Sequence, residues 1–385
     1  MLPRGHLYIN YGELVSGIGK AIWNRKSNLN ALAENELMCL SVRTGFDLVL
    51  GTLNFPAGSE ILVSAINIPD MFSIIEHHKL KAVPISVNKH SLGLDINELE
   101  AAIRPATKVI LISHLFGSTM EMEKIVDLAK KHHLFLFEDA AQAYAGNLYQ
   151  GHPDTDLVMF SFGLIKTNTS IKGAILKFRN LDLMNQVKEI YQNYPVQTNT
   201  RYLKKVVQAL VVKILLNRYI YTRFCWWLSW RKKDLDHVLA SLSRGFPGKD
   251  LIQQIRFRPC SANVSLLNKK ISEFPQQLIS QRTAIGKEIT SALPDHFKIG
   301  SLSKNHTHWI LPVAVGNPKE LIAHLRYHGV DATQKASSLI RHSASTQMLL
   351  PDELNLDELI YLPIYPSMRA ADLKKMVTLI SPKVQ

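Results

Sequence analysis

The sequence is poor in cysteine and has no long uninterrupted apolar run. Its 385 residues include three cysteines, Cys39, Cys225 and Cys260, which are odd in number and far apart. This pattern indicates neither a disulfide framework nor a metal cluster, so we expect a reducing cytoplasm and no bound metal. No stretch reaches the roughly 18 uncharged apolar residues of a membrane-spanning helix. The first residues also lack the continuous apolar core of a secretory signal, which agrees with a cytoplasmic location.

Acidic residues are absent from one segment, residues 201–233, which carries nine lysines and arginines. This segment supplies most of the formal net charge of +13. It is apolar nearly all round and ends in the cluster Trp226-Trp227-Leu228-Ser229-Trp230. Tryptophan, tyrosine, lysine and arginine together are typical of a membrane interface, so we expect residues 201–233 to contact an anionic surface on the inner face of the membrane. The alternative is a helical hairpin packed against the partner of a dimer, with its cations reaching the solvent. Binding of nucleic acid is not expected, because long aliphatic runs do not suit a phosphate surface.

Strand-like and helix-like segments alternate along the first half of the chain. The strand-like runs are at residues 60–64, 82–87, 108–113, 134–139, 157–162 and 173–178, and the helical patterns are at 30–55, 71–79, 96–103 and 122–132. Such alternation predicts an α/β fold with a mostly parallel sheet, in which ligands bind at the carboxyl ends of the strands. A long helix is expected at 262–293, after which strands and helices resume. We therefore expect a large domain at residues 1–255, which contains the insert 201–233, and a smaller α+β domain at residues 256–385.

A lysine and an aspartate follow two of these predicted strands. Asp139 ends the strand-like run Leu134–Asp139, and Lys166 follows the run Leu157–Phe162. A lysine amine can form a Schiff base with the aldehyde of pyridoxal phosphate (PLP). An aspartate can keep the pyridine nitrogen of this cofactor protonated, so that the ring accepts electrons. The pair therefore indicates PLP chemistry, although a lone lysine after a strand is more often a solvated surface residue.

Five segments in the same order resemble the DegT/DnrJ/EryC1/StrS family of sugar aminotransferases. They are Gly58–Val63, Leu94–Ile103, His114–Gly117, Glu138–Ala143 and Ser161–Lys166. Glu138–Ala143 matches the acid motif of the family at every position, and Ser161-Phe162 followed by Lys166 matches its lysine motif in spacing. Apart from the first residues and residues 180–255, the resemblance covers most of the chain.

The resemblance implies a fold-type I PLP enzyme that works as a homodimer, with active sites at the subunit interface. Lys166 would be the catalytic residue, which binds the cofactor and moves the proton at the α-carbon of the substrate. Asp139 would pair with the pyridine nitrogen, Gln142 would contact the ring near its hydroxyl, and Ser161 would donate to the phosphate. The implied cofactor-binding residues are Asp139, Gln142, Ser161, Thr44, Gly45, Phe46, Ile68, His114 and, from the other subunit, Arg256. A helix start near Thr44 and Gly45 suits a phosphate, because its N–H groups and its dipole favour an anion.

The sequence departs from the family pattern at three places. Ile68 stands where family members commonly stack an aromatic ring on the cofactor. Thr44-Gly45-Phe46 stands in place of the Ser-Gly-Thr phosphate turn, which removes a hydroxyl. The glycine-rich turn after the lysine is reduced to Ile171–Ala174, in which Lys172 is interpreted as a surface charge. In addition, His114 fits a packed core histidine as well as a cofactor contact.

Lys166 distinguishes this chain from relatives that have histidine there and act as dehydratases, so the resemblance favours transamination. An amino acid, by resemblance glutamate, would donate the amino group, and a keto sugar carried on a nucleotide would accept it. The basic insert suggests a variant in which the acceptor is lipid-linked or the enzyme works at the membrane surface. Such a reaction belongs to amino-sugar or polysaccharide biosynthesis. The alternative is a PLP-binding, membrane-associated regulatory or interaction protein with little turnover, which the altered phosphate turn and the missing aromatic ring motivate.

Overall fold

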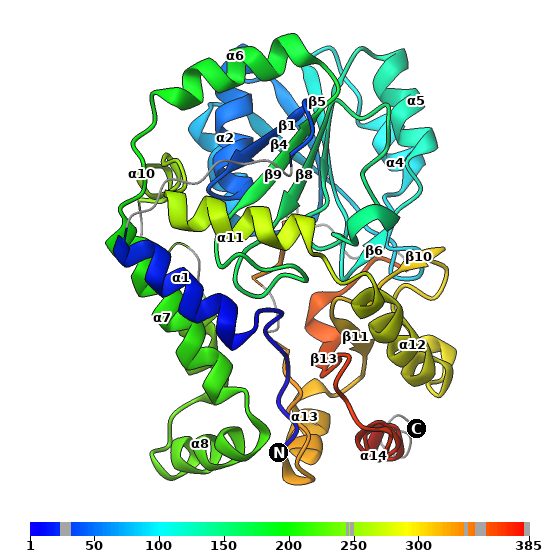
Figure 1. The fold of residues 1–385 in the computed structure, drawn as a ribbon. Coiled ribbons are helices and arrows are strands. Elements are labelled where there is room, and N and C mark those ends of the chain that lie inside the picture. Colours follow the sequence, from blue (N-terminus) through cyan, green and yellow to red (C-terminus); the bar gives the residue numbers. More distant parts are fainter. Residues whose placement is uncertain (24–31, 244–245, 247–249, 335–337, 343–351, 381–385) are drawn as a thin grey trace.

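In the computed structural model of the protein, a seven-stranded sheet forms the centre (Figure 1). The structure describes residues 1–23, 32–243, 246, 250–334, 338–342 and 352–380. In spatial order the strands are β1 (Glu36–Cys39), β9 (Ala174–Phe178), β8 (Leu157–Ser161), β7 (Phe135–Asp139), β5 (Thr107–Ser113), β2 (Glu60–Ser64) and β4 (Lys81–Ile85). Strand β9 runs antiparallel to both of its neighbours, and the other pairs are parallel. The predicted α/β fold with a mostly parallel sheet is confirmed.

Helices cover both faces of the sheet, because its strands are apolar on both sides. Ile61 and Val63 of β2 face one apolar cluster, and Leu62 faces another on the opposite side, as the two-residue period of a strand requires. The helices that contribute to these clusters are α2 (Val42–Leu53), α3 (Pro69–His77) and α6 (Leu181–Gln192) on the first face, and α4 (Ile96–Ala101) and α5 (Glu123–Lys131) on the second. With both faces covered, the carboxyl edge of the sheet is the place where a ligand can bind.

The helix expected at residues 30–55 begins later than predicted. Glu36–Cys39 forms strand β1, which pairs antiparallel with β9, and α2 begins only at Val42. Ser41 caps this helix, because its hydroxyl accepts a hydrogen bond from the backbone N–H of Thr44. The prediction was wrong for the first part of the segment, since its apolar residues belong to two elements. Residues 24–31 lie outside the described part of the chain.

The long helix expected at residues 262–293 is two helices, α11 (Ser261–Ser272) and α12 (Gln277–Ser291). Pro275 lies between them, and proline both lacks a backbone N–H and disfavours helical backbone at the residue before it. Leu267 of α11 packs with apolar residues of the large sheet, whereas Ile289 of α12 belongs to a C-terminal cluster. The two helices therefore contribute to different cores.

The C-terminal elements form an apolar cluster of their own, which also includes Leu2. Its elements are α12, β11 (Leu311–Ala314), α13 (Pro318–Tyr327), β13 (Leu359–Leu362) and α14 (Ala370–Ile380), and β11 pairs antiparallel with β13. Two short strand pairs connect this part with the region of the large sheet, β10 (Asn305–His306) with β6 (Ser118–Thr119) and β12 (Ile340–Arg341) with β3 (Ile66–Asn67). The domain boundary at residue 255 stays a prediction.

The basic segment at residues 201–233 folds as helices that pack against the N-terminal helix. It spans α7 (Asn199–Leu215) and α8 (Arg218–Trp230), which are followed by α9 (Leu235–Ser243) and α10 (Leu251–Ile255). Helix α7 lies along α1 (Tyr11–Trp23), and Tyr202, Val206 and Ala209 on its inner face are buried with Leu14 (Figure 1). The inner face of α7 therefore packs within the chain, and packing of the hairpin against a dimer partner stays a prediction. Within the described ranges, no helix is both long and apolar enough to cross a bilayer.

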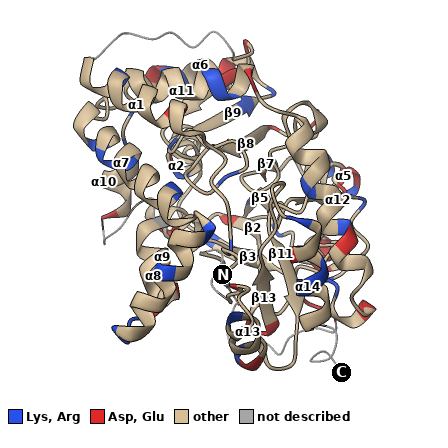
Figure 2. Cartoon of the chain, turned by 60° about the horizontal axis from the view of Figure 1, so that its bottom comes forward, with Lys and Arg blue, Asp and Glu red and all other residues tan. Residues whose placement is uncertain are grey.

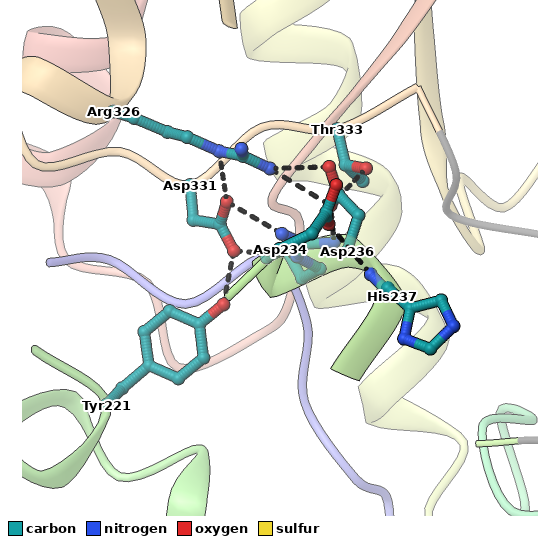
Figure 3. A network of polar contacts seen from close by, with 8 residues as sticks. Tyr221, Asp234, Asp236, His237, Arg326, Asp331 and Thr333 are labelled. Carbon is teal, nitrogen blue, oxygen red and sulfur yellow. Dashed lines mark hydrogen bonds and ion pairs between the residues drawn. The ribbon is translucent and has the colours of Figure 1, made fainter. Parts of the chain in front are cut away.

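Two aspartates connect the N-terminal residues, helices α8 and α9 and the C-terminal part (Figure 3). Asp331 is fully buried and accepts hydrogen bonds from Arg4 Nε at 2.6 Å, from Arg326 Nε at 3.0 Å and from the hydroxyl of Tyr221. Asp236 accepts from the same two arginines, at 2.5 Å from Arg4 Nη1 and 3.0 Å from Arg326 Nη2. Burial alone would raise the pKa of Asp236, but the two guanidinium groups outweigh burial and hold it below its ordinary value.

Replacing Asp331 with asparagine will lower the free energy of unfolding by about 3–5 kcal/mol, because two largely buried arginines then share one carboxylate. Urea unfolding followed by circular dichroism measures this change. Asp154→Asn is the matched control, because Asp154 forms an exposed ion pair with Lys130 whose loss will leave stability nearly unchanged. Equal stability of the two variants would contradict the structural role of the network.

Candidate active site

Lys166 and Asp139 meet at the carboxyl edge of the sheet. Strand β7 ends at Asp139, and its parallel neighbour β8 ends at Ser161, shortly before Lys166. The backbone N–H of Lys166 closes the turn after β8 by donating to Gly163 O at 3.0 Å. The two side chains are close enough that the charge of each shifts the pKa of the other. Two residues predicted from separate segments therefore form one site.

Burial sets the charge balance of this pair. Burial lowers the pKa of the Lys166 amine to about 8, an effect that the Asp139 carboxylate opposes and the Arg43 guanidinium strengthens. Burial also raises the pKa of Asp139, against the backbone N–H of Ala141 at 2.9 Å and the charge of Lys166. A lowered lysine pKa leaves more of the amine neutral near neutral pH, which is the form that attacks an aldehyde. A buried carboxylate, in turn, favours a cation beside it.

An aromatic ring that no sequence pattern indicated lies against the lysine. Lys166 Nζ is 4.2 Å from the ring centre of Trp309, a geometry in which ring and ammonium attract each other. The indole N–H of Trp309 donates to Ile165 O at 3.2 Å, and the side chain is buried. Trp309 comes from a segment far along the chain, just before β11, so no local pattern around Lys166 indicates it.

A fully buried arginine positions the segment that follows the lysine. Arg282 of α12 donates from Nη1 to the hydroxyl of Thr167 at 3.0 Å and from Nε to Thr307 O at 2.8 Å. Its guanidinium thereby joins the residue after Lys166 to the segment that carries Trp309. Sequence reasoning missed Arg282, because an arginine within a helical pattern is normally read as a solvated residue.

The start of α2 and two hydroxyl groups line a small cavity near the lysine. Ser41, Arg43 and Ser161 are part of the wall of this cavity, which has a volume of about 70 Å³. The first N–H groups of a helix lack partners in the helix and, with the helix dipole, favour an anion. Ser161 Oγ, which accepts from the N–H of Gly163 at 3.4 Å, can donate its own proton to a ligand. The cavity suits the phosphate that was predicted near Ser161.

The expected phosphate turn Thr44-Gly45-Phe46 is displaced, because α2 begins before it. The hydroxyl of Thr44 donates to Ile255 O at 2.8 Å, and Phe46 is fully buried against Phe137. A Cβ on Gly45 would lie 2.5 Å from Leu176, so this glycine allows close packing of the helix on the sheet. These three side chains serve the core, and the N–H groups at the helix start are those of Val42 and Arg43.

Three further predicted residues differ in how well they suit a ligand. Gln142 uses its carbonyl oxygen to accept from the N–H of Phe116 at 2.9 Å, so its amide nitrogen stays the proposed donor to the ring hydroxyl. Ile68 caps α3 and is partly buried beside the first apolar cluster, where its role as a ring cover stays a prediction. His114 is buried, with Nε2 2.8 Å from the hydroxyl of Tyr149 and Nδ1 accepting from the N–H of Met120 at 3.2 Å. Because both ring nitrogens are engaged, His114 fits the packed core alternative.

Arg256, which was expected to reach the cofactor of another subunit, is held within its own chain. Its Nε and Nη2 both lie 2.9 Å from the carboxylate oxygens of Asp47, which is itself buried in α2. Burial would raise the pKa of Asp47, but hydrogen bonds from His78 and Arg256 hold it below the ordinary value. This bidentate pair fixes the guanidinium on α2 in the single chain, and a contact of Arg256 with the cofactor of another subunit stays a prediction.

The groups at this edge fit PLP in its three recognisable parts. A buried amine with a lowered pKa suits the aldehyde, a buried carboxylate suits the pyridine nitrogen, and a cavity at a helix start suits the phosphate. Among the described residues, no group of His, Cys, Asp and Glu side chains could hold a metal ion.

Comparison with known proteins matches residues 33–215 to the DegT/DnrJ/EryC1/StrS aminotransferase family. The UDP-4-amino-4-deoxy-L-arabinose–oxoglutarate aminotransferase of Shewanella sediminis is 23% identical over 372 residues, which cover 91% of this chain and 86% of that protein. The GDP-perosamine synthase of Caulobacter vibrioides is 27% identical over 177 residues, 45% of this chain and 47% of that protein.

Solved structures repeat the fold over the whole chain. The aminotransferase TlmJ of Streptoalloteichus hindustanus superposes with a TM-score of 0.72 at 14% identity, covering 100% of this chain and 98% of that one. At this identity the likeness concerns the fold.

Proposed function

The chain belongs to the DegT/DnrJ/EryC1/StrS aminotransferase family and is a PLP-dependent transaminase, and from this premise we propose that it moves an amino group from glutamate to a keto sugar carried on a nucleotide or a lipid. The observation that carries the proposal is the half-buried Lys166, whose amine pKa is lowered to about 8 by desolvation, beside the buried Asp139 carboxylate. Similarity to sugar aminotransferases supports a sugar acceptor.

Each side chain at the carboxyl edge of the sheet would have a separate role in amino transfer. When bound, PLP supplies an electron-accepting ring. Lys166 would hold the aldehyde carbon and, once released, move a proton to and from the α-carbon of the substrate. Asp139 would accept a hydrogen bond from the ring nitrogen and keep it protonated. Trp309, buried beside the amine, would exclude water from this proton transfer.

The cofactor would be fixed at its two ends. Ser161 and the N–H groups at the start of α2 would bind the phosphate, and the amide nitrogen of Gln142 would donate to the ring hydroxyl. Each hydrogen bond to a charged group adds about 1.5–3 kcal/mol to such an interaction. Anchors at both ends keep the reacting carbon aligned with Lys166, which is how positioning lowers a barrier.

The proposed activity is tested with purified protein loaded with PLP. The visible absorbance of the lysine-bound cofactor should bleach on addition of glutamate, with release of one oxoglutarate per site. A band that persists with every amino donor tried would favour the alternative of a PLP-binding regulatory protein with little turnover. A panel of nucleotide-linked keto sugars, supplied after the glutamate step, would then identify the acceptor by return of the band.

The family resemblance also implies a homodimer, which we propose for this chain. Light scattering after size-exclusion chromatography tests it: a mass near twice 43.5 kDa is expected, and a monomeric mass would refute it.

The outer face of α8 supports peripheral attachment to an anionic membrane. Trp226 and Trp230 are 71% and 66% exposed, and Arg231 lies over both the Trp227 and the Trp230 rings, at 5.7 and 5.1 Å. Lysines and arginines recur along α7 and α8, and no acidic residue occurs between Arg201 and Lys233 (Figure 2). Exposed tryptophans among cations match the interface of a bilayer with anionic headgroups. We therefore propose that this face binds the inner surface of the membrane.

Replacing Trp226 and Trp230 together with serine will reduce sedimentation with phosphatidylglycerol vesicles by about tenfold or more, because two large apolar groups lose their place in the interface. Sedimentation of the unaltered protein should also fall at high salt. Tyr327→Ser, which removes an aromatic residue of 87% exposure from α13, is the matched control. Equal sedimentation of all three proteins would contradict the membrane proposal.

A further inference from the structure

The cavity beside the start of α2 is also lined by residues that the family resemblance did not indicate. They are Lys172, from the turn before β9, and Lys205 and Gln208, from α7. Lys172, interpreted from the sequence as a surface charge, is instead partly buried in the cavity wall. No aspartate or glutamate is among the described residues of the lining. Two ammonium groups of the chain therefore border a cavity that has no carboxylate in its wall.

Among the residues that the structure describes, Lys172 forms no ion pair with a carboxylate. Burial, together with the charges of Lys205 and Arg201, lowers the pKa of Lys172 to about 8. Its Nζ lies 4.7 Å from the ring centre of Phe246, a contact that satisfies a cation only in part. Arg43, the third cation of the wall, already pairs with Asp70. An ammonium group removed from water without a counter-ion is unfavourable, and an anion bound in the cavity would offset that cost.

The cavity lies directly beside the catalytic lysine. Gly163 is part of its wall, and a Cβ placed on this glycine would be 3.9 Å from Lys166 Cγ and 3.6 Å from Ser161 Oγ. An anion in the cavity would therefore lie near the stem of Lys166 and the hydroxyl of Ser161. The volume of about 70 Å³ suits a single phosphate group.

We propose that Lys172 and Lys205 bind the phosphate of PLP, so that the chain that carries Lys166 also supplies the cations for its own cofactor. This inference rests on the proposed function, because it assumes that PLP is bound through Lys166. The two ammonium groups take the place of the hydroxyl that the altered phosphate turn lacks. They also explain how the phosphate is neutralised although Arg256 is held by Asp47.

The experiment compares PLP with pyridoxal, which has the same aldehyde and ring but no phosphate. Dissociation constants for both are measured by titrating the visible absorbance of the lysine-bound ring. Lys172→Met should weaken PLP binding about tenfold or more, because a charged hydrogen bond to phosphate is lost, and should leave pyridoxal binding within about twofold. Lys205→Met should act in the same direction. Lys204→Met, which removes an exposed cation from the adjacent position, should change neither constant.

If Lys172→Met leaves the ratio of the PLP and pyridoxal dissociation constants unchanged, the inference is overturned. The anion bound in the cavity would then be the phosphate of a substrate. A second measurement guards against misfolding: inorganic phosphate should raise the melting temperature of the cofactor-free protein and of Lys204→Met but not of Lys172→Met. A phosphate-induced rise in melting temperature in Lys172→Met as well as in the other two proteins would also overturn the inference. Failure of the proposed function looks different, because a protein that binds PLP through these lysines but releases no oxoglutarate from glutamate would contradict transamination alone.

Discussion

Replacing Lys166 with methionine will abolish amino transfer, with a loss of at least about 10³-fold in kcat, because in the proposed mechanism the same amine both holds the cofactor and moves the proton. The visible band of the lysine-bound cofactor should disappear as well. Steady-state oxoglutarate release and an absorbance spectrum measure the two effects. Added methylamine should restore a small part of the activity, because it can take over the proton transfer. Lys188→Met, on the exposed side of α6, is the control and should retain full activity.

The pH dependence of pyridoxal uptake provides an independent check on Lys166. Burial lowers the pKa of its amine from 10.5 to about 8, and only the neutral amine attacks an aldehyde. The association rate of pyridoxal, which has no phosphate for Lys172 to bind, should therefore rise as the pH increases through about 8. Stopped-flow absorbance measures this rate, and a midpoint near 10.5 would mean that the amine is solvated rather than buried.

Asp139→Asn will lower kcat by about 10²- to 10³-fold while the visible band of bound PLP remains, because the amide keeps the shape of the side chain and loses the charge that keeps the ring nitrogen protonated. A purely structural role would instead lower stability and cofactor content together. Asp182→Asn, at the exposed start of α6, is the matched control.

The same variant should shift the titration of its neighbour. The Asp139 carboxylate raises the pKa of Lys166, in opposition to burial, so its removal will move the midpoint of pyridoxal uptake below about 8. Unchanged kcat and an unchanged midpoint in Asp139→Asn would together show that the carboxylate does not face the site.

The sheet and the lysine–aspartate pair were predictable from the sequence because their signals are local. Apolar runs bounded by turns indicated the strands, and parallel strands bring their carboxyl ends to one edge, so Asp139 and Lys166 had to meet. The start of α2 was misplaced because the short strand β1 is as apolar as the helix, and only the Ser41 cap separates them. Secondary-structure propensity alone cannot locate the boundary between β1 and α2.

The residues that complete the site could not be predicted, because long-range packing places them. Trp309 and Arg282 reach Lys166 and Thr167 from the C-terminal part, more than a hundred positions away in sequence. From the sequence, Lys172 is interpreted as a surface charge. Only the fold shows that Lys172 and Lys205 of α7 line the same cavity. No periodicity or motif records a contact between segments that far apart.

The network around Asp331 has a consequence for how the chain folds as it is synthesised. Arg4 is synthesised well before its partner Asp331, which is 327 positions later in the chain. Leu2 likewise donates its N–H to Gly329 O at 2.7 Å. Because domains generally fold in the order in which they emerge, the segment around Leu2 and Arg4 cannot form these contacts until residues 329–331 have been synthesised. The segment that carries Leu2 and Arg4 is thus among the last parts of the described chain to reach its native contacts.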